Sequence, residues 1–411
     1  MMTGEPCVLA FDLGTTTLAA RLLDRKGEVL AEGRLRNPQY VLGSDVVRRL
    51  EAAQRGEGER LQTLLVEGMD ALLAELLRQA DLSRQQVQAA AAAANPAVSH
   101  LLCRCPVDSL LYPPHKPVFR QGLSLEPLSL GLDLPCALYL FPLVSGYVGG
   151  DLVAFLHAHP PQSARTLYLD VGTNGEMALY HEGRWLVTSV AAGPAFEAAG
   201  ISCGMPLGEG AIEGIALEAD RWALKVVGGG PARGLCGSGL AQVVALARRE
   251  GLIDSRGTIV DAASIETNLS RYIVEETGER SLRLFRDAVI DLRLTQQDIR
   301  SFQLAKGAIR AGVDCLLKRA GLEGAKDIQV MLTGALGLSL PSEVLKRVAM
   351  LPENMLENVH FVAGGALRGV GRMLLQKDGV AEVEGLARSL KPYPLSGTPV
   401  FEDAFIKSLD F

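Results

Sequence analysis

The sequence predicts an α/β protein made of two similar lobes, with a ligand-binding cleft between them. The first observation is an internal repeat: residues 7–35 and 166–193 each begin with a short apolar run that ends in Asp and continues as D-x-G-T. The second is that each copy goes on with an apolar run, a polar turn containing glycine and another apolar run. This order is typical of a three-stranded meander. Because the same sequence pattern occurs twice, the chain is expected to contain two halves with similar structures.

Composition fits a globular protein and excludes several classes of function. Of the 411 residues, 48% are hydrophobic and 21% are charged, which is enough apolar material for two cores. The net charge of -6 gives no basic field to attract nucleic acid. No apolar stretch approaches the ~20 residues that span a bilayer, and the first residues lack the features of a signal peptide. We therefore expect a cytoplasmic protein with no nucleic-acid or membrane partner.

Cysteine spacing supports neither a disulfide framework nor a metal motif. The count is odd, no C-x-x-C pair occurs, and the seven cysteines are scattered as Cys7, Cys103, Cys105, Cys136, Cys203, Cys236 and Cys315. Isolated cysteines of this kind usually behave as small buried hydrophobic residues. We expect reduced thiols throughout.

The elements of the first half follow from periodicity and from Gly and Pro. Leucines at three- and four-residue spacings predict an amphipathic helix over residues 61–79. A strand is expected at 88–94. Gly149-Gly150-Asp151 introduces a further helix, which Pro160-Pro161 closes. The first lobe is therefore assigned to residues 1–160.

The second half predicts a similar set of elements. Gly237-Ser238-Gly239 marks a helix start, and Thr295, with Asp298 three residues on, caps a helix over 294–319. Residues 261–291 have mixed polarity and predict no regular element. A strand at 328–332 and a helix from Gly364-Gly365 to Leu375 complete the second lobe, assigned to 161–380. The remaining tail, 381–411, is expected to pack over the surface.

The two D-x-G-T turns carry the predicted chemistry. In each, an apolar strand delivers a carboxylate to its end, Asp12 or Asp170, and the glycine that follows allows the backbone to approach a ligand closely. The threonine hydroxyl and the N–H groups of such a turn can cradle phosphate oxygens. Two such turns predict a pair of phosphate-binding sites facing one another across a cleft. The two carboxylates would then converge on the metal that accompanies a triphosphate.

With these turns the chain resembles the superfamily of sugar kinases, actin and heat-shock chaperone ATPases, which have an actin-like, ribonuclease H-like fold. Candidates for the five parts of the superfamily pattern occur in order. They are the first phosphate motif at 11–17, the first connecting helix at 149–156, the second phosphate motif at 169–176, the adenosine motif at 330–337 and the second connecting helix from 362–371.

A closer resemblance is to the ATPase portion of the reductive activators of corrinoid-dependent enzymes. It rests on DLGTTTLAARLLD, NPQYVLGSDVVRRL, FPLVSGYVGGDLVAFL, DVGTNGEMAL, GPAFEAAGISCGMPLGEGAI, ARGLCGSGL, LTQQDIRSFQLAKGAIRAG and LTGALG. The resemblance implies that ATP drives electron transfer to cob(II)alamin proteins. Family members that do this carry an N-terminal [2Fe–2S] domain, whereas this chain starts almost directly at its first phosphate motif and has no C-x4-C-x2-C run. We therefore expect no iron–sulfur cluster and a separate reductase.

The resemblance also implies roles for individual residues. Asp12 and Asp170 would hold Mg²⁺ through water, as catalytic metal ligands. Asp151 would orient the attacking water, although a carboxylate favoured by the helix dipole explains it equally well. The residues expected to contact ATP are Gly14, Thr15, Thr16, Gly172, Thr173 and Asn174 at the phosphates, Gly237 and Ser238 at a helix start, Gly334 and Gly337 at the adenosine, and Lys306 beside the base. A solvated helical lysine is the alternative for Lys306. The glycine-rich residues 193–212 are expected over the cleft mouth or at a partner surface.

Three functional classes remain open at this stage. The first is an ATPase that couples cleft closure to activation of a corrinoid protein or another metalloprotein. The second is a small-molecule kinase on the same fold, which needs a catalytic base beside an acceptor hydroxyl that the sequence does not place. The third is a nucleotide-dependent scaffold with little turnover. The oligomeric state is left open.

Overall fold

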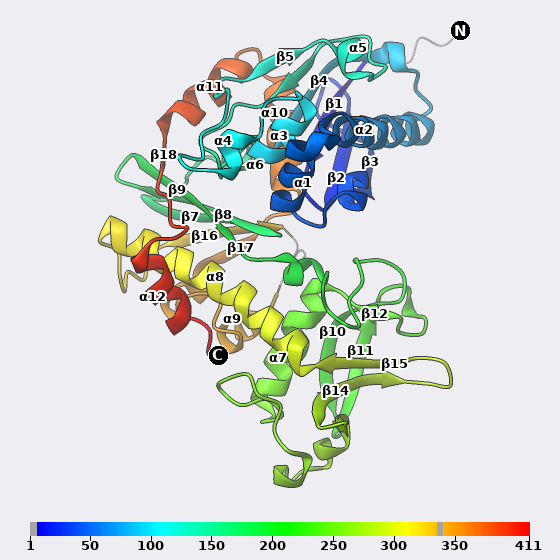
Figure 1. The fold of residues 1–411 in the computed structure, drawn as a ribbon, viewed down its shortest axis with the longest axis vertical. Helices are drawn as coiled ribbons and strands as arrows, with labels where there is room; N and C mark the ends of the chain where they lie inside the picture. Colours follow the sequence, from blue (N-terminus) through cyan, green and yellow to red (C-terminus); the bar gives the residue numbers. More distant parts are fainter. Residues whose placement is uncertain (1–5, 335–339) are drawn as a thin grey trace. The chain divides into compact units, whose positions relative to one another are not determined.

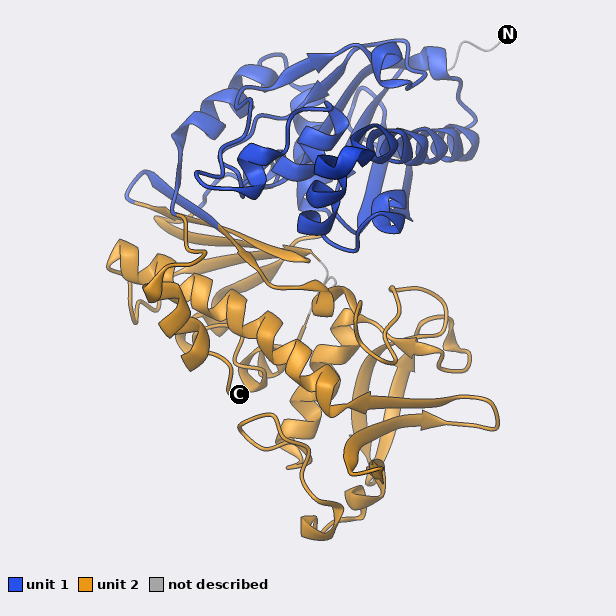
Figure 2. Ribbon diagram, viewed as in Figure 1, with its two compact units in different colours: residues 1–162, 182–188, 364–393 blue, residues 163–181, 189–363, 394–411 orange. Residues whose placement is uncertain are grey.

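The structure, a computed structural model, describes residues 6–334 and 340–411. Contacts divide the chain into two compact units, shown in different colours in Figure 2. Unit 1 comprises Met1–Gln162, Glu182–Thr188 and Gly364–Tyr393, and unit 2 comprises Ser163–His181, Ser189–Ala363 and Pro394–Phe411. Both units are therefore assembled from segments far apart in the sequence.

The sheet of unit 1 has the order β3-β2-β1-β4-β6-β5 (Figure 1). Its strands are β1 (Cys7–Leu13), β2 (Thr17–Leu23), β3 (Val29–Arg36), β4 (Val87–Ala94), β5 (Leu123–Leu125) and β6 (Leu138–Leu140). The first three form the predicted antiparallel meander, and β4 and β6 extend it in parallel from β1. Strand β1 is buried along almost its whole length, as expected of a central strand covered on both faces.

The helices of unit 1 include the predicted amphipathic one. It is α2 (Gly58–Ala80), which buries Leu65, Leu72 and Leu76 in the core beside Leu9 and Phe11 of β1. The others are α1 (Val46–Ala52), α3 (Pro96–Leu102), α4 (Asp108–Leu111), α5 (Pro127–Leu130), α6 (Gly150–Ala158), α10 (Gly365–Leu375) and α11 (Gly379–Ser389). Helix α6 begins at Gly150, as predicted.

The division into units differs from the predicted lobes at Glu182–Thr188, which belongs to unit 1, and after residue 363. The sequence places 364–380 in the second lobe and 381–411 in a separate tail, whereas Gly364–Tyr393 groups with unit 1. The cause is close packing between α10 and α6. A side chain at Gly369 would overlap the Ala154 backbone, and one at Gly365 would lie 2.6 Å from the Phe155 ring. Small residues at these points let the two helices touch.

The second six-stranded sheet has the order β17-β16-β7-β8-β9-β18. Its strands are β7 (Arg165–Val171), β8 (Asn174–His181), β9 (Arg184–Ala191), β16 (Gln329–Gly334), β17 (Val359–Phe361) and β18 (Leu390–Pro392). An antiparallel pair, β7 and β8, is followed on the other side of β7 by parallel β16 and β17. This repeats the arrangement of β1, β2, β4 and β6, so the sequence repeat corresponds to a repeated strand plan.

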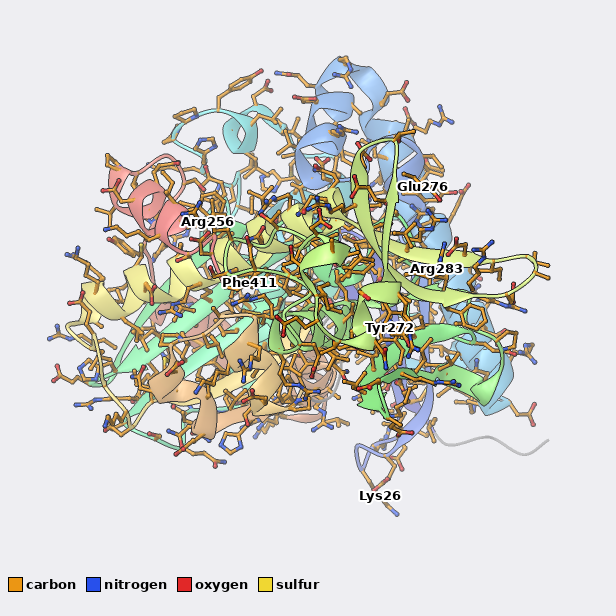
Figure 3. All side chains as sticks on the ribbon, turned by 90° about the horizontal axis from the view of Figure 1, so that it is seen from below. Lys26, Arg256, Tyr272, Glu276, Arg283 and Phe411 are labelled. Atoms are coloured by element: carbon orange, nitrogen blue, oxygen red, sulfur yellow. The ribbon has the colours of Figure 1, made fainter. Side chains whose placement is uncertain are left out.

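Unit 2 also contains two small sheets. These are β10 (Ala211–Glu218) with β11 (Arg221–Val226) and β12 (Gly234–Leu235), and β13 (Ile273–Glu276) with β14 (Glu279–Arg286) and β15 (Asp291–Thr295). Figure 3 labels Tyr272 near this region, and its ring lies 4.3 Å from that of Trp222. Strands β13 and β14 lie in the segment for which no element was predicted. They were missed because most of their residues are exposed or half-buried, so no apolar alternation is visible.

The helices of unit 2 are α7 (Gly237–Arg249), α8 (Gln296–Ala320), α9 (Ser342–Arg347) and α12 (Pro399–Lys407). Helix α8 begins at Gln296 rather than at Leu294, because Leu294 pairs with Leu282 in the sheet. The predicted cap is confirmed: Thr295 and Asp298 form a reciprocal capping box. Within residues 6–334 and 340–411, no helix is long and apolar enough to cross a membrane.

Candidate functional site

The first D-x-G-T turn joins β1 to β2. It is tight: the Gly14 N–H donates to Thr17 O at 3.0 Å. A Cβ at Gly14 would lie 2.7 Å from the same oxygen, so glycine is required here. Thr15 is buried. The predicted phosphate residues Gly14, Thr15 and Thr16 therefore form one compact loop at the end of a buried strand.

Two asparagines brace this first turn. Asn37 donates from Nδ2 to Gly14 O at 2.9 Å and from its backbone N–H to Thr16 O at 2.8 Å. Asn95 donates from Nδ2 to Thr15 Oγ1 at 3.0 Å, while its Oδ1 accepts from Val98 N and caps α3. Sequence reasoning assigned neither a role at the site. A shared signal was present: each is followed by proline and comes directly after a strand of the meander or its neighbour.

Behind Asn37 lies a buried polar network. Gln39 accepts from Arg49 Nη1 at 3.3 Å and donates to Leu61 O at 2.9 Å. Arg49 also donates to Gly43 O at 2.9 Å. Because buried polar groups that are fully hydrogen-bonded rigidify their surroundings, this network fixes the asparagine that holds the turn.

The predicted carboxylates Asp12 and Asp151 come together in unit 1. Burial, followed by the nearby charge of Asp151, raises the pKa of Asp12 to about 7, while Arg34 acts in the opposite direction. Burial also raises the pKa of Asp151, against the effect of hydrogen bonds from backbone N–H groups such as that of Leu152. Two acids that repel one another in this way are typical of sites that hold a cation or exchange a proton.

The second D-x-G-T turn joins β7 to β8 in unit 2. The Gly172 N–H donates to Asn174 O and the Gly193 N–H donates to Thr173 O, both at 2.9 Å. Thr173 makes two further bonds, because its Oγ1 donates to Glu197 Oε2 at 3.0 Å and its backbone N–H donates to Glu197 Oε1 at 3.3 Å. Where neutral amides brace the first turn, a carboxylate braces the second.

Gly334 lies against the Asp170 side of this second turn. It ends β16, has φ 102° and faces Asp170 so closely that a Cβ would lie 2.7 Å from Oδ1. Gly334 therefore sits beside the predicted metal ligand. Gly337, predicted to admit the nucleotide, lies outside the described residues.

Gly237 and Ser238 form the first turn of α7, as predicted. Ser238 Oγ lies 3.3 Å from Cys236 Sγ and 3.4 Å from Glu213 O. The start of α7 is connected to the glycine-rich segment, because Gly204 pairs with Leu235 just before it. Their contact with a nucleotide stays a prediction.

Lys306 is not placed as the sequence suggested. Its side chain is fully buried in α8, and Nζ donates to Asp410 O and lies 5.0 Å from the Phe411 ring centroid. Phe411 donates in turn from its N–H to Ser255 O at 2.9 Å, and Figure 3 labels it near Arg256. Lys306 therefore anchors residues 410–411 to α8 and is not a solvated lysine, while its place beside a nucleotide base stays a prediction. Burial, followed by the charge of Arg310, lowers the pKa of Lys306 to about 8.

The chemistry of these residues fits Mg²⁺ with a nucleotide. Among the described residues, no three or more His, Cys, Asp or Glu side chains are grouped to hold a metal. Mg²⁺ needs no such cage, since it keeps several waters and binds one or two carboxylates together with phosphates. Asp12 belongs to unit 1 and Asp170 to unit 2. Their joint binding of one ion stays a prediction.

Comparison with known proteins identifies relatives over the whole chain. Residues 164–411 match the family described as the C-terminal domain of RACo, the ASKHA domain, and residues 7–160 match the RACo middle region. The corrinoid activation enzyme RamQ of Eubacterium limosum is 28% identical, over 98% of this chain and 70% of the relative. The Co(II) methylated amine-specific corrinoid protein reductase of Methanosarcina barkeri is 22% identical, over 93% and 72%.

A solved structure supports the same relationship. It is described as a reductive activator for corrinoid, iron–sulfur protein, and it matches with a TM-score of 0.91 and 28% identity, over 100% of this chain and 67% of that one. The predicted actin-like fold and the predicted resemblance are confirmed by these matches.

Proposed function

Because the chain belongs to the RACo family, with its C-terminal ASKHA domain, we propose that it binds and hydrolyses Mg-ATP to drive reductive activation of a corrinoid protein. The observation that carries the proposal is the match over the whole chain to a corrinoid activation enzyme, together with the two D-x-G-T turns. A partner that is another metalloprotein is a broader version of the same proposal.

The two turns support the ATP-binding part. Each places a glycine and a threonine directly after a strand that ends near an aspartate. Bound Mg²⁺ would supply positive charge that neutralises the β- and γ-phosphates. Asp12 and Asp170 would hold its water ligands, and the backbone N–H groups and hydroxyls of the turns would hold the phosphate oxygens.

Asp151 supports the hydrolytic part. It lies at the first turn of α6, close enough to Asp12 for their charges to interact. A carboxylate in this position can accept a hydrogen bond from a water molecule and orient it toward phosphorus. Its raised pKa also suits it to accept a proton as the water attacks.

The electron comes from outside these 411 residues in this proposal. Reduction of cob(II)alamin to cob(I) consumes one electron, which ATP hydrolysis does not provide. The seven cysteines are free thiols in the structure and none of them forms a C-x4-C-x2-C run. ATP would therefore supply free energy through a conformational change, while a separate reductase supplies the electron.

The test is anaerobic reduction of a methylated-amine-specific corrinoid protein, the kind of partner named for the Methanosarcina relative. Loss of the cob(II) signal and release of phosphate are followed with a strong artificial reductant, with and without ATP. We expect ATP to accelerate reduction, the corrinoid protein to stimulate hydrolysis, and Asp170→Asn to abolish both effects. Equal rates with and without ATP would overturn the proposal, and phosphorylation of a hydroxylated metabolite would move it to the kinase class.

A further inference from the structure

Glu197 occupies the donors that a phosphate would use at the second turn. Its two carboxylate oxygens accept from the Thr173 N–H at 3.3 Å and from Thr173 Oγ1 at 3.0 Å. A Cβ at Gly172 would lie 3.3 Å from Oε1, so the carboxylate also lies close against the glycine of the turn. A backbone N–H and a hydroxyl offered together are the groups that D-x-G-T turns present to phosphate oxygens.

The carboxylate and a phosphate cannot share these donors. Both are anionic acceptors, and the hydroxyl has a single proton to donate. Two like charges at hydrogen-bonding distance from one N–H group would also repel one another strongly. The arrival of a phosphate therefore requires Glu197 to leave.

Glu197 belongs to a segment that is fixed at several points. It lies in the short turn Pro194–Glu197, between Gly193 with φ 80° and Ala198 with φ 58°. Left-handed backbone at alanine is unfavourable and persists only where neighbouring contacts impose it. The contacts with Thr173 are among those that hold this turn.

Farther along, the same segment contacts two helix starts. The N–H and Oγ of Ser202 donate to Asp298 Oδ1, the capping residue of α8, at 2.8 and 3.1 Å. Gly204 pairs with Leu235, two residues before Gly237 at the start of α7. A movement of Glu197 would therefore occur in a segment that contacts residues at the start of both helices.

We propose that Glu197 is a placeholder for a nucleotide phosphate, which displaces it on binding and so releases the segment of residues 193–205. The inference rests on the proposed function, because it takes the incoming anion to be a phosphate of Mg-ATP. It makes the second turn a switch that reports nucleotide binding through the glycine-rich segment. The first turn is braced instead by the neutral side chains of Asn37 and Asn95.

The test compares Glu197→Gln with the wild type in Mg-ATP binding by calorimetry. The substitution keeps the shape of the side chain and removes the charge, so the remaining hydrogen bonds are about half as strong and repulsion is lost. We expect Kd to fall roughly tenfold. The matched control is Glu209→Gln, in the glycine-rich residues 193–212 but outside 193–205, whose side chain packs against Gly228 instead. Its Kd should change less than about twofold.

Hydrogen exchange provides the second measurement. Mg-ATP should increase exchange over residues 193–205 in the wild type, whereas Glu197→Gln should show fast exchange there before ATP is added. A Kd that is unchanged or raised in Glu197→Gln, with the wild type binding normally, overturns the placeholder alone. Absence of binding in both proteins overturns the placeholder together with the proposed function. Binding only by Glu197→Gln would support the placeholder.

Discussion

The two D-x-G-T turns have the same sequence pattern and are braced in opposite ways. At the first, Asn37 and Asn95 donate amide protons to the turn. At the second, the turn donates its own N–H and hydroxyl protons to the carboxylate of Glu197. The first turn therefore accepts hydrogen bonds from neutral side chains, while the second donates to an internal anion. Repeated turns need not be equivalent, because what surrounds them decides whether each is ready for a ligand.

The largest expected effect comes from Asp170, the carboxylate of the second turn. Replacing Asp170 by Asn removes a carboxylate while keeping its shape, and we expect ATP hydrolysis to fall at least about 100-fold, the size typical of losing one electrostatic group at a reacting phosphate. The stabilisation of the melting temperature by Mg-ATP should also disappear. Hydrolysis and melting curves with and without nucleotide provide the measurement. An unchanged nucleotide shift would contradict the metal assignment of Asp170.

A second change crowds only the second turn. In Gly334→Ala, the added methyl group would overlap the Val171 carbonyl oxygen and lie 2.7 Å from Asp170 Oδ1, and the backbone stays at φ 102°, so we expect a loss of about 1–3 kcal/mol in the free energy of unfolding. Denaturant titration measures it. Gly324→Ala is the matched control, because φ is 77° there and nothing lies within 4 Å of the added carbon. Equal losses in the two variants would show that crowding against Val171 and Asp170 is unimportant.

A third change makes the first turn resemble the second. In Asn95→Asp, the side chain still caps α3 through Val98, but a carboxylate replaces the amide that donates to Thr15. We expect Mg-ATP to bind roughly tenfold more weakly, since the hydroxyl of Thr15 now bonds to a competing anion. Asn95→Ser keeps a cap without the charge and serves as the control. Similar affinity in Asn95→Asp and the wild type would remove the distinction drawn between the two braces.

The smallest expected effect is on the pH dependence of stability and comes from Lys306, which lies in neither turn. The pKa of Lys306 is about 8 in the folded protein against 10.5 for the free side chain, so between these values the unfolded chain binds more protons and stability rises with pH. From pH 8 to pH 9, we expect the wild type to gain about 1 kcal/mol relative to Lys306→Met. Denaturant midpoints at several pH values test this, with exposed Lys318→Met as the control. Nucleotide affinity should not differ at pH 7.

The sequence predicted local features of the site but not the contacts between residues that are far apart in the chain. The turns at Gly14 and Gly172 and the cap at Thr295 were predicted, because each depends on residues that are neighbours in the chain. The groups that brace the turns were not, since Asn95 is 80 residues from Thr15 and Glu197 is 24 from Thr173. The neighbouring residues of Asn95 and Glu197 do not indicate which turn each side chain contacts.

Lys306 shows a second limit of prediction from the sequence. Its place in α8 follows from helical periodicity, but the surface that buries it is formed by residues 409–411, which follow more than a hundred positions later. A lysine in an amphipathic pattern is ordinarily exposed. Only the packing of Asp410 and Phe411 shows otherwise.

The packing of α10 has a consequence for how the protein is made. Unit 1 uses residues up to Gln162, then Glu182–Thr188 and finally Gly364–Tyr393, so some two hundred residues leave the ribosome between its first and last parts. Domains ordinarily fold as they emerge during synthesis. Here the surface of α6 that packs against α10 stays uncovered during synthesis, because Gly365 and Gly369 have not been translated when α6 appears. Expression of residues 1–162 alone would leave that helix permanently without its partner.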